Sequence, residues 1–159
     1  MPKVQKGGEK KIEIYTDGAC PGNGFGAKVG GVGVYFGPDD ARNISEKLMD
    51  MKNGVTNNQV ELLALVRALE YIEKNREACH IFTDSIYGMK VCTEWRHGWK
   101  KRGWKKADGK PVLNLELVQK LDELMIQCEP WVTFSHVRGH QGIPGNEAAD
   151  ALAVKACAL

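Results

Sequence analysis

Residues 56–84 read TNNQVELLALVRALEYIEKNREACHIFTD, and this stretch predicts a long helix followed by a short strand. Thr56, Asn57 and Asn58 are typical of a helix start, because their side chains can accept hydrogen bonds from free backbone N–H groups. Apolar side chains then recur at helical spacing as far as residue 74, at Leu62, Leu65, Val66, Leu69 and Ile72. Residues 79–84 (CHIFTD) are a short apolar strand. A helix that leads into such a strand is typical of a crossover between parallel strands.

Three further strands are predicted upstream of this helix. Residues 11–17 (KIEIYTD) alternate between apolar and polar side chains, and residues 32–36 and 43–49 are two more strand-like segments. Residues 18–31 are rich in glycine and are predicted to be a loop. The short connections between these strands favour an antiparallel meander.

The remaining third of the chain alternates between helical and extended patterns. We expect a helix over residues 86–95, a basic block that can include a short helix, a helix over 115–125, a strand over 131–137 and a closing helix over 146–156. Together with the upstream segments, this order predicts one α/β domain, in which helices pack on a single mixed sheet.

The composition is that of an ordinary soluble domain. The chain has 159 residues with no run near the roughly 18 apolar residues of a membrane span, so no membrane partner is expected. Its five cysteines form no CxxC pair, which favours reduced thiols over a disulfide or zinc framework. Residues 1–11 lack the apolar core of a secretion signal and are interpreted as a flexible basic tail. We therefore expect an intracellular protein, in the cytoplasm or, in a eukaryote, in the nucleus.

Positive charge is concentrated in one block. Seven of the 22 basic residues lie between Trp95 and Pro111 with a single acid, Asp108, although the whole chain carries a net charge of only +2. The rest of the chain is therefore mildly acidic, and the block predicts one surface for a polyanion. Trp95, Trp99 and Trp104 lie among these charges, and by composition alone they are the small core of a local unit.

Four acids are candidate metal ligands: Asp17, Glu61, Asp84 and Asp150. Each alone has an ordinary explanation, as a turn residue, a residue of a helix's first turn, a helix cap or an exposed helix residue. Asp17 and Asp84, however, end two strands that we expect to be parallel neighbours, and such strand ends share one edge of a sheet. Crowded carboxylates are tolerated when a cation holds them, and oxygen ligands favour Mg²⁺ or Mn²⁺ over zinc. Four acids can serve two such ions about 4 Å apart.

Five stretches of the chain, taken in order, resemble ribonuclease H of the type 1 class. They are IYTDGAC (14–20), TNNQVELLAL (56–65), FTDS (82–85), WKKRGWKKADGKPV (99–112) and HVRGHQGIPGNEAADALA (136–153). The resemblance implies an RNase H-like fold whose five-stranded mixed sheet has three antiparallel and two parallel strands, with helices on both faces. It places a catalytic domain at residues 12–157, including a basic handle at about 95–112.

The resemblance also implies a reaction and its catalytic residues. The reaction is endonucleolytic hydrolysis of the RNA strand of an RNA–DNA hybrid with two Mg²⁺ ions, or Mn²⁺, leaving 3′-hydroxyl and 5′-phosphate ends. Asp17 and Asp84 correspond to central metal ligands, and Glu61 and Asp150 complete the set. His140 corresponds to a loop histidine that assists turnover. Glu147 is an auxiliary acid or a capping residue.

Contacts to the hybrid follow from the same resemblance. Cys20, Asn23, Asn57, Asn58 and Gln59 correspond to residues near the minor groove, where the 2′-hydroxyl marks the RNA strand; Cys20 could instead be a packed thiol. The DNA strand is expected to meet the handle, at Trp95, Trp99, Lys100, Lys101, Arg102, Lys105 and Lys106, whereas Trp104 and Trp131 are expected to pack.

A pocket for one DNA phosphate is implied at Thr56 and Asn114. Many members of the family have a basic residue two positions before the threonine, where this chain has Gly54. The departure puts the strength of the pocket in doubt, and Lys52 is a hypothetical substitute.

Three other readings remain open from the sequence. The chain could be the ribonuclease H domain of a reverse transcriptase or retroelement, or a non-catalytic module that only binds hybrids. A transposase or integrase of related fold would have fewer acids in another order and no Trp-Lys block. The main expectation is a free-standing monomer that acts on RNA–DNA hybrids.

Overall fold

The computed structural model describes residues 10–21, 28–49 and 54–159. Asn23, Lys52 and most of the predicted tail lie outside these residues. Five strands form one sheet in the order β3-β2-β1-β4-β5: β1 (Ile12–Ala19), β2 (Val29–Tyr35), β3 (Ile44–Met49), β4 (Cys79–Thr83) and β5 (Val132–His136). β1, β2 and β3 pair antiparallel, and β4 pairs in parallel with both β1 and β5. The predicted fold class, with its mixed sheet and crossover, is confirmed.

The prediction of a loop over residues 18–31 is wrong at both ends. β1 continues through Gly18 and Ala19, and β2 already begins at Val29. The reason is the close approach of the last helix, α5 (Pro144–Cys157), to the glycines of β2. A Cβ atom on Gly31 would lie 1.8 Å from the carbonyl oxygen of Ala153, and one on Gly33 would lie 2.1 Å from that of Ala149. Gly31 and Gly33 are therefore strand residues whose lack of a side chain lets α5 pack directly on β2.

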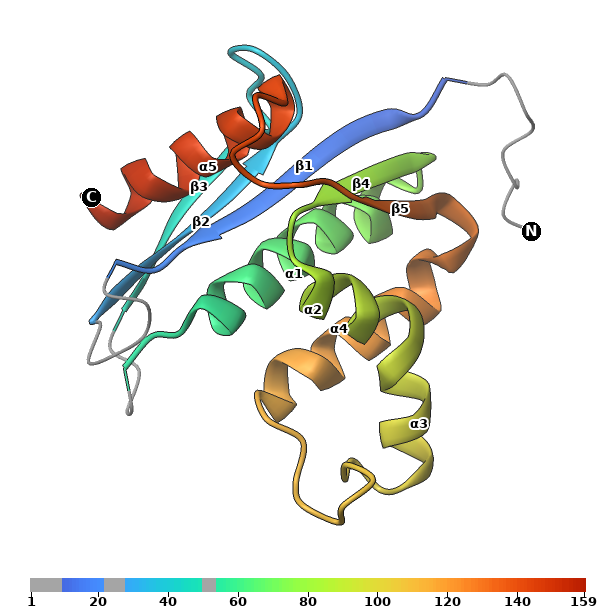
Figure 1. The fold of residues 1–159 in the computed structure, drawn as a ribbon. Coiled ribbons are helices and arrows are strands. Elements are labelled where there is room, and N and C mark those ends of the chain that lie inside the picture. Colours follow the sequence, from blue (N-terminus) through green and yellow to red (C-terminus); the bar gives the residue numbers. More distant parts are fainter. Residues whose placement is uncertain (1–9, 22–27, 50–53) are drawn as a thin grey trace.

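The crossover helix α1 (Asn57–Asn75) covers the other face of the sheet (Figure 1). Thr56 caps it as predicted: its side chain accepts a hydrogen bond from the backbone N–H of Gln59, while the Gln59 side chain accepts one from the backbone N–H of Thr56. This reciprocal capping box satisfies two backbone donors that the helix leaves free. All five predicted apolar positions of the helix are buried in the core.

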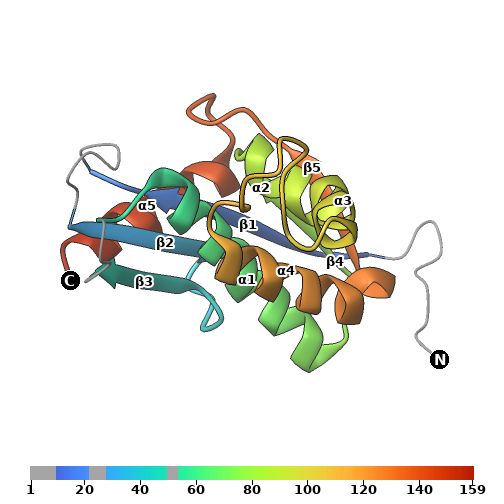
Figure 2. The same ribbon diagram turned by 90° about the horizontal axis from the view of Figure 1, so that it is seen from below.

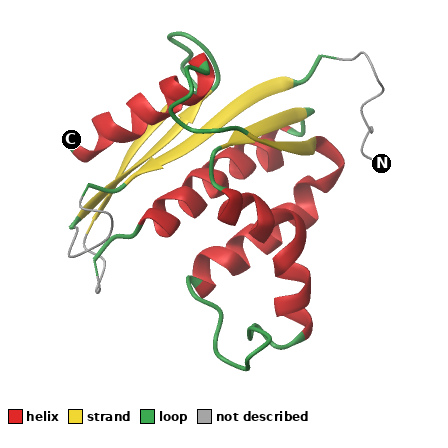
Figure 3. Cartoon of the chain, viewed as in Figure 1, coloured by secondary structure: helices red, strands yellow, loops and turns green. Residues whose placement is uncertain are grey.

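Helices therefore cover both faces of the sheet, as Figure 3 shows with α5 on one side and α1 on the other. Helix α4 (Leu115–Cys128) packs along α1 and adds a second helical layer on that side, which Figure 2 shows from below. A short 3₁₀ turn, η2 (Glu129–Trp131), links α4 to β5. Trp131 packs partly buried against the core, as predicted.

The predicted helix over 86–95 is part of a longer helical segment with an irregular centre. It consists of α2 (Ile86–Lys90), a π-helical turn η1 (Val91–Trp95) and α3 (Arg96–Lys101). The chain then returns through a loop to α4, and this whole excursion projects away from the sheet (Figure 1). We call residues 95–112 the handle.

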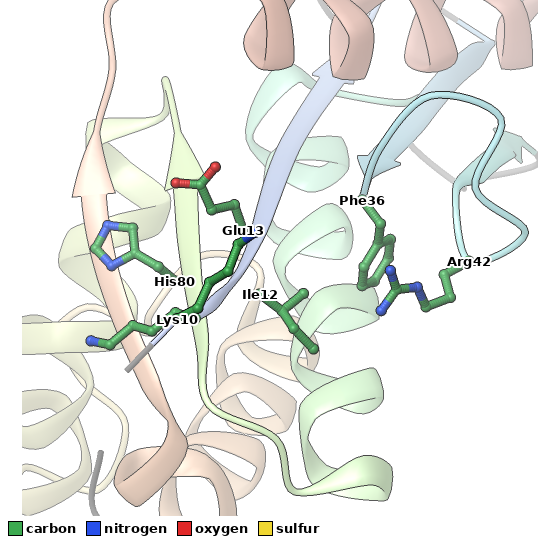
Figure 4. Close-up of a pocket in the computed structure, with 7 residues that line it drawn as sticks. Lys10, Ile12, Glu13, Phe36, Arg42 and His80 are labelled. Carbon is green, nitrogen blue, oxygen red and sulfur yellow. The ribbon is translucent and has the colours of Figure 1, made fainter. Parts of the chain in front are cut away.

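An open hollow of about 710 Å³ lies at the start of β1, at the far end of the strand from Asp17. Figure 4 shows Lys10, Glu13 and His80 on one side of the strand and Ile12, Phe36 and Arg42 on the other. The hollow contains none of the four candidate acids. Among the described residues, no helix is long and apolar enough to cross a membrane.

Candidate metal centre

Asp17 lies near the end of β1 and is almost completely buried, with 4% of its surface exposed. Its neighbour in the antiparallel pair is Gly33 of β2, a residue without a side chain. One carboxylate oxygen accepts a hydrogen bond of 2.9 Å from the backbone N–H of Gly18. Burying a carboxylate with few hydrogen bonds and no positive partner costs free energy of folding, so a cation or another compensating group is expected near Asp17.

Glu61 reaches the same point from the first turns of α1. Its Oε1 atom accepts a hydrogen bond of 2.8 Å from the same N–H of Gly18. A Cβ atom on Gly18 would lie 2.6 Å from the Val60 side chain and 2.9 Å from the backbone nitrogen of Glu61. The glycine therefore lets the start of α1 approach the end of β1.

Asp84 is the residue that follows β4. Thr83 is paired in parallel with Thr16, so Asp84 and Asp17 emerge side by side at one edge of the sheet, as the strand ends predicted. One oxygen from each of Asp17, Glu61 and Asp84 can be chosen so that all three lie within 4.8 Å of one another. Three oxygen donors at this spacing suit a hard divalent cation such as Mg²⁺.

Two of the three acids, Asp17 and Glu61, have raised pKa values. Burial raises the pKa of Asp17 above its usual value of 3.8, and the charges of Glu61 and Asp84 raise it further. Burial also raises the pKa of Glu61, with the charge of Asp84 as the next cause. A bound cation would remove this repulsion and favour the ionised carboxylates.

Asp150 lies on α5 and is half-buried, outside the group of three. Its charge nevertheless contributes to the raised pKa of Glu61, so it faces the same site. The structure thus brings three predicted ligands together and puts the fourth beside them. Glu147 lies in the first turn of α5, near the loop glycine Gly142.

His140 lies in the loop that precedes α5. It is exposed and adopts a left-handed backbone conformation, with φ of 57°. The preceding residue, Gly139, touches the site: a Cβ atom there would lie 2.6 Å from a carboxylate oxygen of Asp84. The loop between β5 and α5 therefore passes beside Asp84 at Gly139, and the exposed His140 follows directly.

The predicted hybrid-contact residues of α1 are near the acids. Asn57 and Asn58 are exposed in its first turn, one turn before Glu61, and Gln59 is engaged in the capping box. The Cys20 thiol donates to the carbonyl oxygen of Val55 at 3.1 Å, as a packed thiol would.

The two predicted phosphate ligands come from separate elements. Thr56 caps α1, and Asn114 precedes α4 in a left-handed conformation with φ of 57°. The Asn114 side-chain amide donates to the Tyr87 hydroxyl at 3.4 Å. Gly54 also has a positive φ of 82°, a conformation that favours glycine.

The handle combines aromatic rings with exposed charge. The Trp95 and Trp99 rings are 5.8 Å apart, and Tyr87 extends the cluster at 6.0 Å from Trp95. Trp104 packs partly buried against the core, as predicted. Five Lys and Arg side chains here are exposed, those of Lys100, Lys101, Arg102, Lys105 and Lys110, and that of Lys106 is half-buried.

Two residues near these surfaces escaped the sequence analysis. Asn146 is buried with 2% of its surface exposed, and its amide lies 3.4 Å from a carboxylate oxygen of Asp84. Arg96 was counted with the surface charges of the basic block, but it is buried, and its charge is matched by acids of α4 and η2. Neither burial has a signal in the sequence, because both depend on how helices meet.

Comparisons with known proteins agree with this fold. The family model for RNase H matches residues 9–158. The curated Ribonuclease H of Ruthia magnifica is 46% identical over 143 residues, which are 90% of this chain and 92% of that protein. The Ribonuclease H of an Acidovorax strain is 43% identical over 145 residues, 91% of this chain and 93% of that protein.

A solved structure adds a similarity in three dimensions. The crystal structure of LC9-RNase H1, described as a type 1 RNase H with the type 2 active-site motif, matches this chain with a TM-score of 0.69 at 30% sequence identity. The match covers 94% of this chain and 74% of that one. The span of the family model, residues 9–158, includes every strand of the sheet and all four acids. The chain belongs to the RNase H family.

Proposed function

We propose that this protein is a metal-dependent endonuclease that hydrolyses the RNA strand of RNA–DNA hybrids and leaves 3′-hydroxyl and 5′-phosphate ends. The observation that carries the proposal is the convergence of Asp17, Glu61 and Asp84 within 4.8 Å at one edge of the sheet. Membership of the RNase H family and the names of the relatives support the ribonuclease activity.

Asp17, Glu61, Asp84 and Asp150 would hold the metal ions, with Asp17 and Asp84 as the central ligands. Two bound Mg²⁺ ions would activate the attacking water and neutralise the charge on the leaving 3′-oxygen. Mn²⁺ is an alternative because it accepts the same oxygen donors. The protein's own task is to hold the carboxylates in place, which β1, the end of β4, α1 and α5 do.

Other side chains would supply proton transfer and substrate contacts. His140 is exposed on the loop whose Gly139 lies against Asp84, and from this loop it would exchange a proton with the product or with water. Asn57 and Asn58 stand one turn from Glu61, where short polar side chains can contact the RNA strand. The handle would bind the phosphates of the DNA strand.

A non-catalytic hybrid-binding module is the second candidate, and the acids oppose it. Buried carboxylates beside a phosphate backbone would repel the ligand unless a cation lay between them. A binder would gain nothing from their raised pKa values. The reverse transcriptase alternative keeps the same site and chemistry, and it changes only the protein to which the domain belongs.

The test is cleavage of an end-labelled RNA–DNA hybrid by the whole chain, with Mg²⁺ and with a chelator. We expect cleavage only with metal, only of the RNA strand, and not of single-stranded RNA, duplex RNA or duplex DNA. Extension of the RNA products by a polymerase would show the 3′-hydroxyl ends. Metal-independent cleavage, or none at all with Mg²⁺ or Mn²⁺, would refute the proposal.

A further inference from the structure

The helix that carries the front of the handle is anchored by a charged side chain. Arg96 is the single fully buried residue of α3, with 2% of its surface exposed. Trp99 of the same helix packs only partly buried against the core. An arginine is rarely buried unless its charge is paired, so its contacts decide how α3 sits.

The Arg96 guanidinium makes contacts to three elements. Its Nε donates to the carbonyl oxygen of Cys92 at 2.7 Å, one terminal nitrogen to Asp122 of α4 at 2.7 Å and the other to Glu129 of η2 at 2.8 Å. The second oxygen of Asp122 pairs with the Lys100 ammonium at 2.9 Å, one turn further along α3. Glu129, Arg96, Asp122 and Lys100 thus form one chain of charges, which we call the anchor network.

The anchor network also completes the π-helical turn. In an α-helix the backbone N–H of Arg96 would donate to the carbonyl oxygen of Cys92, four residues back. In η1 it donates instead to that of Val91, five residues back, and the Arg96 side chain takes the place at Cys92. The extra residue of a π turn rotates the following helix by about 100° relative to a regular one.

Hydrogen bonds to charged groups are directional, whereas apolar contacts tolerate sliding and rotation. A helix held by a planar guanidinium between two carboxylates therefore has a defined rotation about its own axis. That rotation sets where Trp99 and Lys101 of α3 point and how Trp99 lies relative to Trp95 of η1.

We propose that Arg96, together with Asp122, is a positioning residue for hybrid binding, which holds the π turn and thereby aims the aromatic and basic side chains of α3 at the DNA strand. The proposal rests on the proposed function, because it assumes that the handle binds that strand. Arg96 itself does not touch substrate, since it is buried.

The test replaces the anchor network by apolar side chains of similar size in the double variant Arg96→Met/Asp122→Leu. Lys100 and Glu129 remain solvent-accessible, so the change leaves no buried unpaired charge; side-chain exposure is 49% for Lys100 and 58% for Glu129. Such replacements of buried ion pairs often keep or raise stability. We expect a thermal midpoint near that of the wild type, a kcat within about twofold, and a KM for hybrid raised about five- to tenfold, as expected when binding is lost without chemistry.

Two independent measurements distinguish a change in the orientation of the α3 side chains from a loss of stability. The affinity for hybrid in metal-free buffer, followed by anisotropy at several salt concentrations, should fall with a slope shallower by about one, because fewer phosphates are neutralised. The near-ultraviolet circular dichroism of the Trp95–Trp99 pair should change, since their mutual orientation depends on the π turn. The control is Arg67→Met, which removes another arginine held by two carboxylates, Glu46 and Glu70, far from the handle.

If the double variant does not fold, Arg96→Lys replaces it in the test. Lysine keeps the positive charge but cannot donate to Asp122 and Glu129 with the planar geometry of a guanidinium. An unchanged KM and salt slope in a folded variant would overturn the proposal, and so would an equal change in Arg67→Met. Failure of the proposed function would show separately, as a wild-type protein that binds hybrid and does not cut it.

Discussion

Glu61 accepts a hydrogen bond from the backbone N–H of Gly18 at 2.8 Å, and the same N–H donates to Asp17. One peptide group thus ties the acid of the crossover helix to the acid of the central strand. Because both carboxylates share this donor, they are held close to each other by the protein itself. The crowding of charge is built into the fold, and several consequences can be measured.

Replacing Asp17 by Asn should separate chemistry from stability. We expect cleavage of hybrid to fall roughly a thousandfold, since metal ligation stabilises the transition state by several kcal/mol. The metal-free variant should melt at a higher temperature than the wild type, because an amide avoids the cost of burying an ionisable carboxyl group beside Glu61 and Asp84. Glu13→Gln, an exposed acid on the same strand, is the control for calorimetry and kinetics. Retained activity in Asp17→Asn would contradict its role as a ligand.

Asp150→Asn should be the milder of the two losses of charge. Asp150 lies outside the group of three acids that meet within 4.8 Å, so its removal leaves those ligands in place. We expect a smaller fall in kcat than for Asp17→Asn, with activity partly recovered at higher Mg²⁺. Metal titrations of the two variants side by side would test this order, which a greater loss in Asp150→Asn would reverse.

Substitution of Gly18 by Ala should push α1 away from β1. The added Cβ would lie 2.6 Å from the Val60 side chain, and overpacking of this kind costs about 1–3 kcal/mol. We expect a lower free energy of unfolding and a lower kcat together, because Glu61 moves relative to Asp17. In Gly37→Ala the nearest atom is 3.8 Å from the new Cβ, so both quantities should stay at wild-type values. Urea denaturation and initial rates give the comparison.

His80 should make the protein less stable in mild acid. Burial lowers the pKa of His80 below its usual value of 6.5, with the charge of Lys11 as a further cause. The unfolded chain therefore binds this proton at a higher pH than the folded one, and stability is lost as the pH falls through 6.5 towards the folded pKa. The free energy of unfolding should be measured at several pH values between about 5 and 7.5, around the usual pKa of histidine. It should depend less steeply on pH in His80→Gln than in the wild type. The exposed His97→Gln is the control, and equal slopes in all three proteins would exclude His80 as the cause.

The exposed lysines of the handle should control the salt dependence of hybrid binding. Each phosphate contact removed should reduce the slope of log affinity against log salt by about one. We expect this change for Lys101→Ala and Lys105→Ala, and no change for Lys120→Ala on the exposed side of α4. Equal slopes for handle and control variants would remove the handle from the binding surface.

The sequence predicts the parts of the site that depend on strand order. Asp17 and Asp84 follow from two parallel strand ends, and Glu61 follows from its place at the start of the crossover helix. Asp150 depends on how α5 returns over the sheet, which no local pattern shows, and its prediction rests more on the resemblance than on spacing.

The errors come from residues whose role is set by tertiary packing. The glycine-rich residues 18–31 predicted a loop because glycine usually disfavours strands, but at Gly31 of β2 the close approach of α5 outweighs that cost. Arg96 looked like one more surface charge, since a run of basic residues does not reveal which side chain a π turn directs inward. In both cases the local preference was overridden by a neighbouring helix.

The glycines of β2 have a consequence for how this protein tolerates mutation. No side chain separates Gly31 and Gly33 from the backbone of α5, so no change of rotamer can absorb an added methyl group. In a saturation mutagenesis screen, Gly31 and Gly33 should tolerate substitution as poorly as the four candidate metal ligands do. The glycine variants should fail in folding, whereas the variants of the acids should fail in catalysis. Variants of the acids should accumulate as soluble, inactive protein, whereas variants of these two glycines should be depleted before activity can be measured.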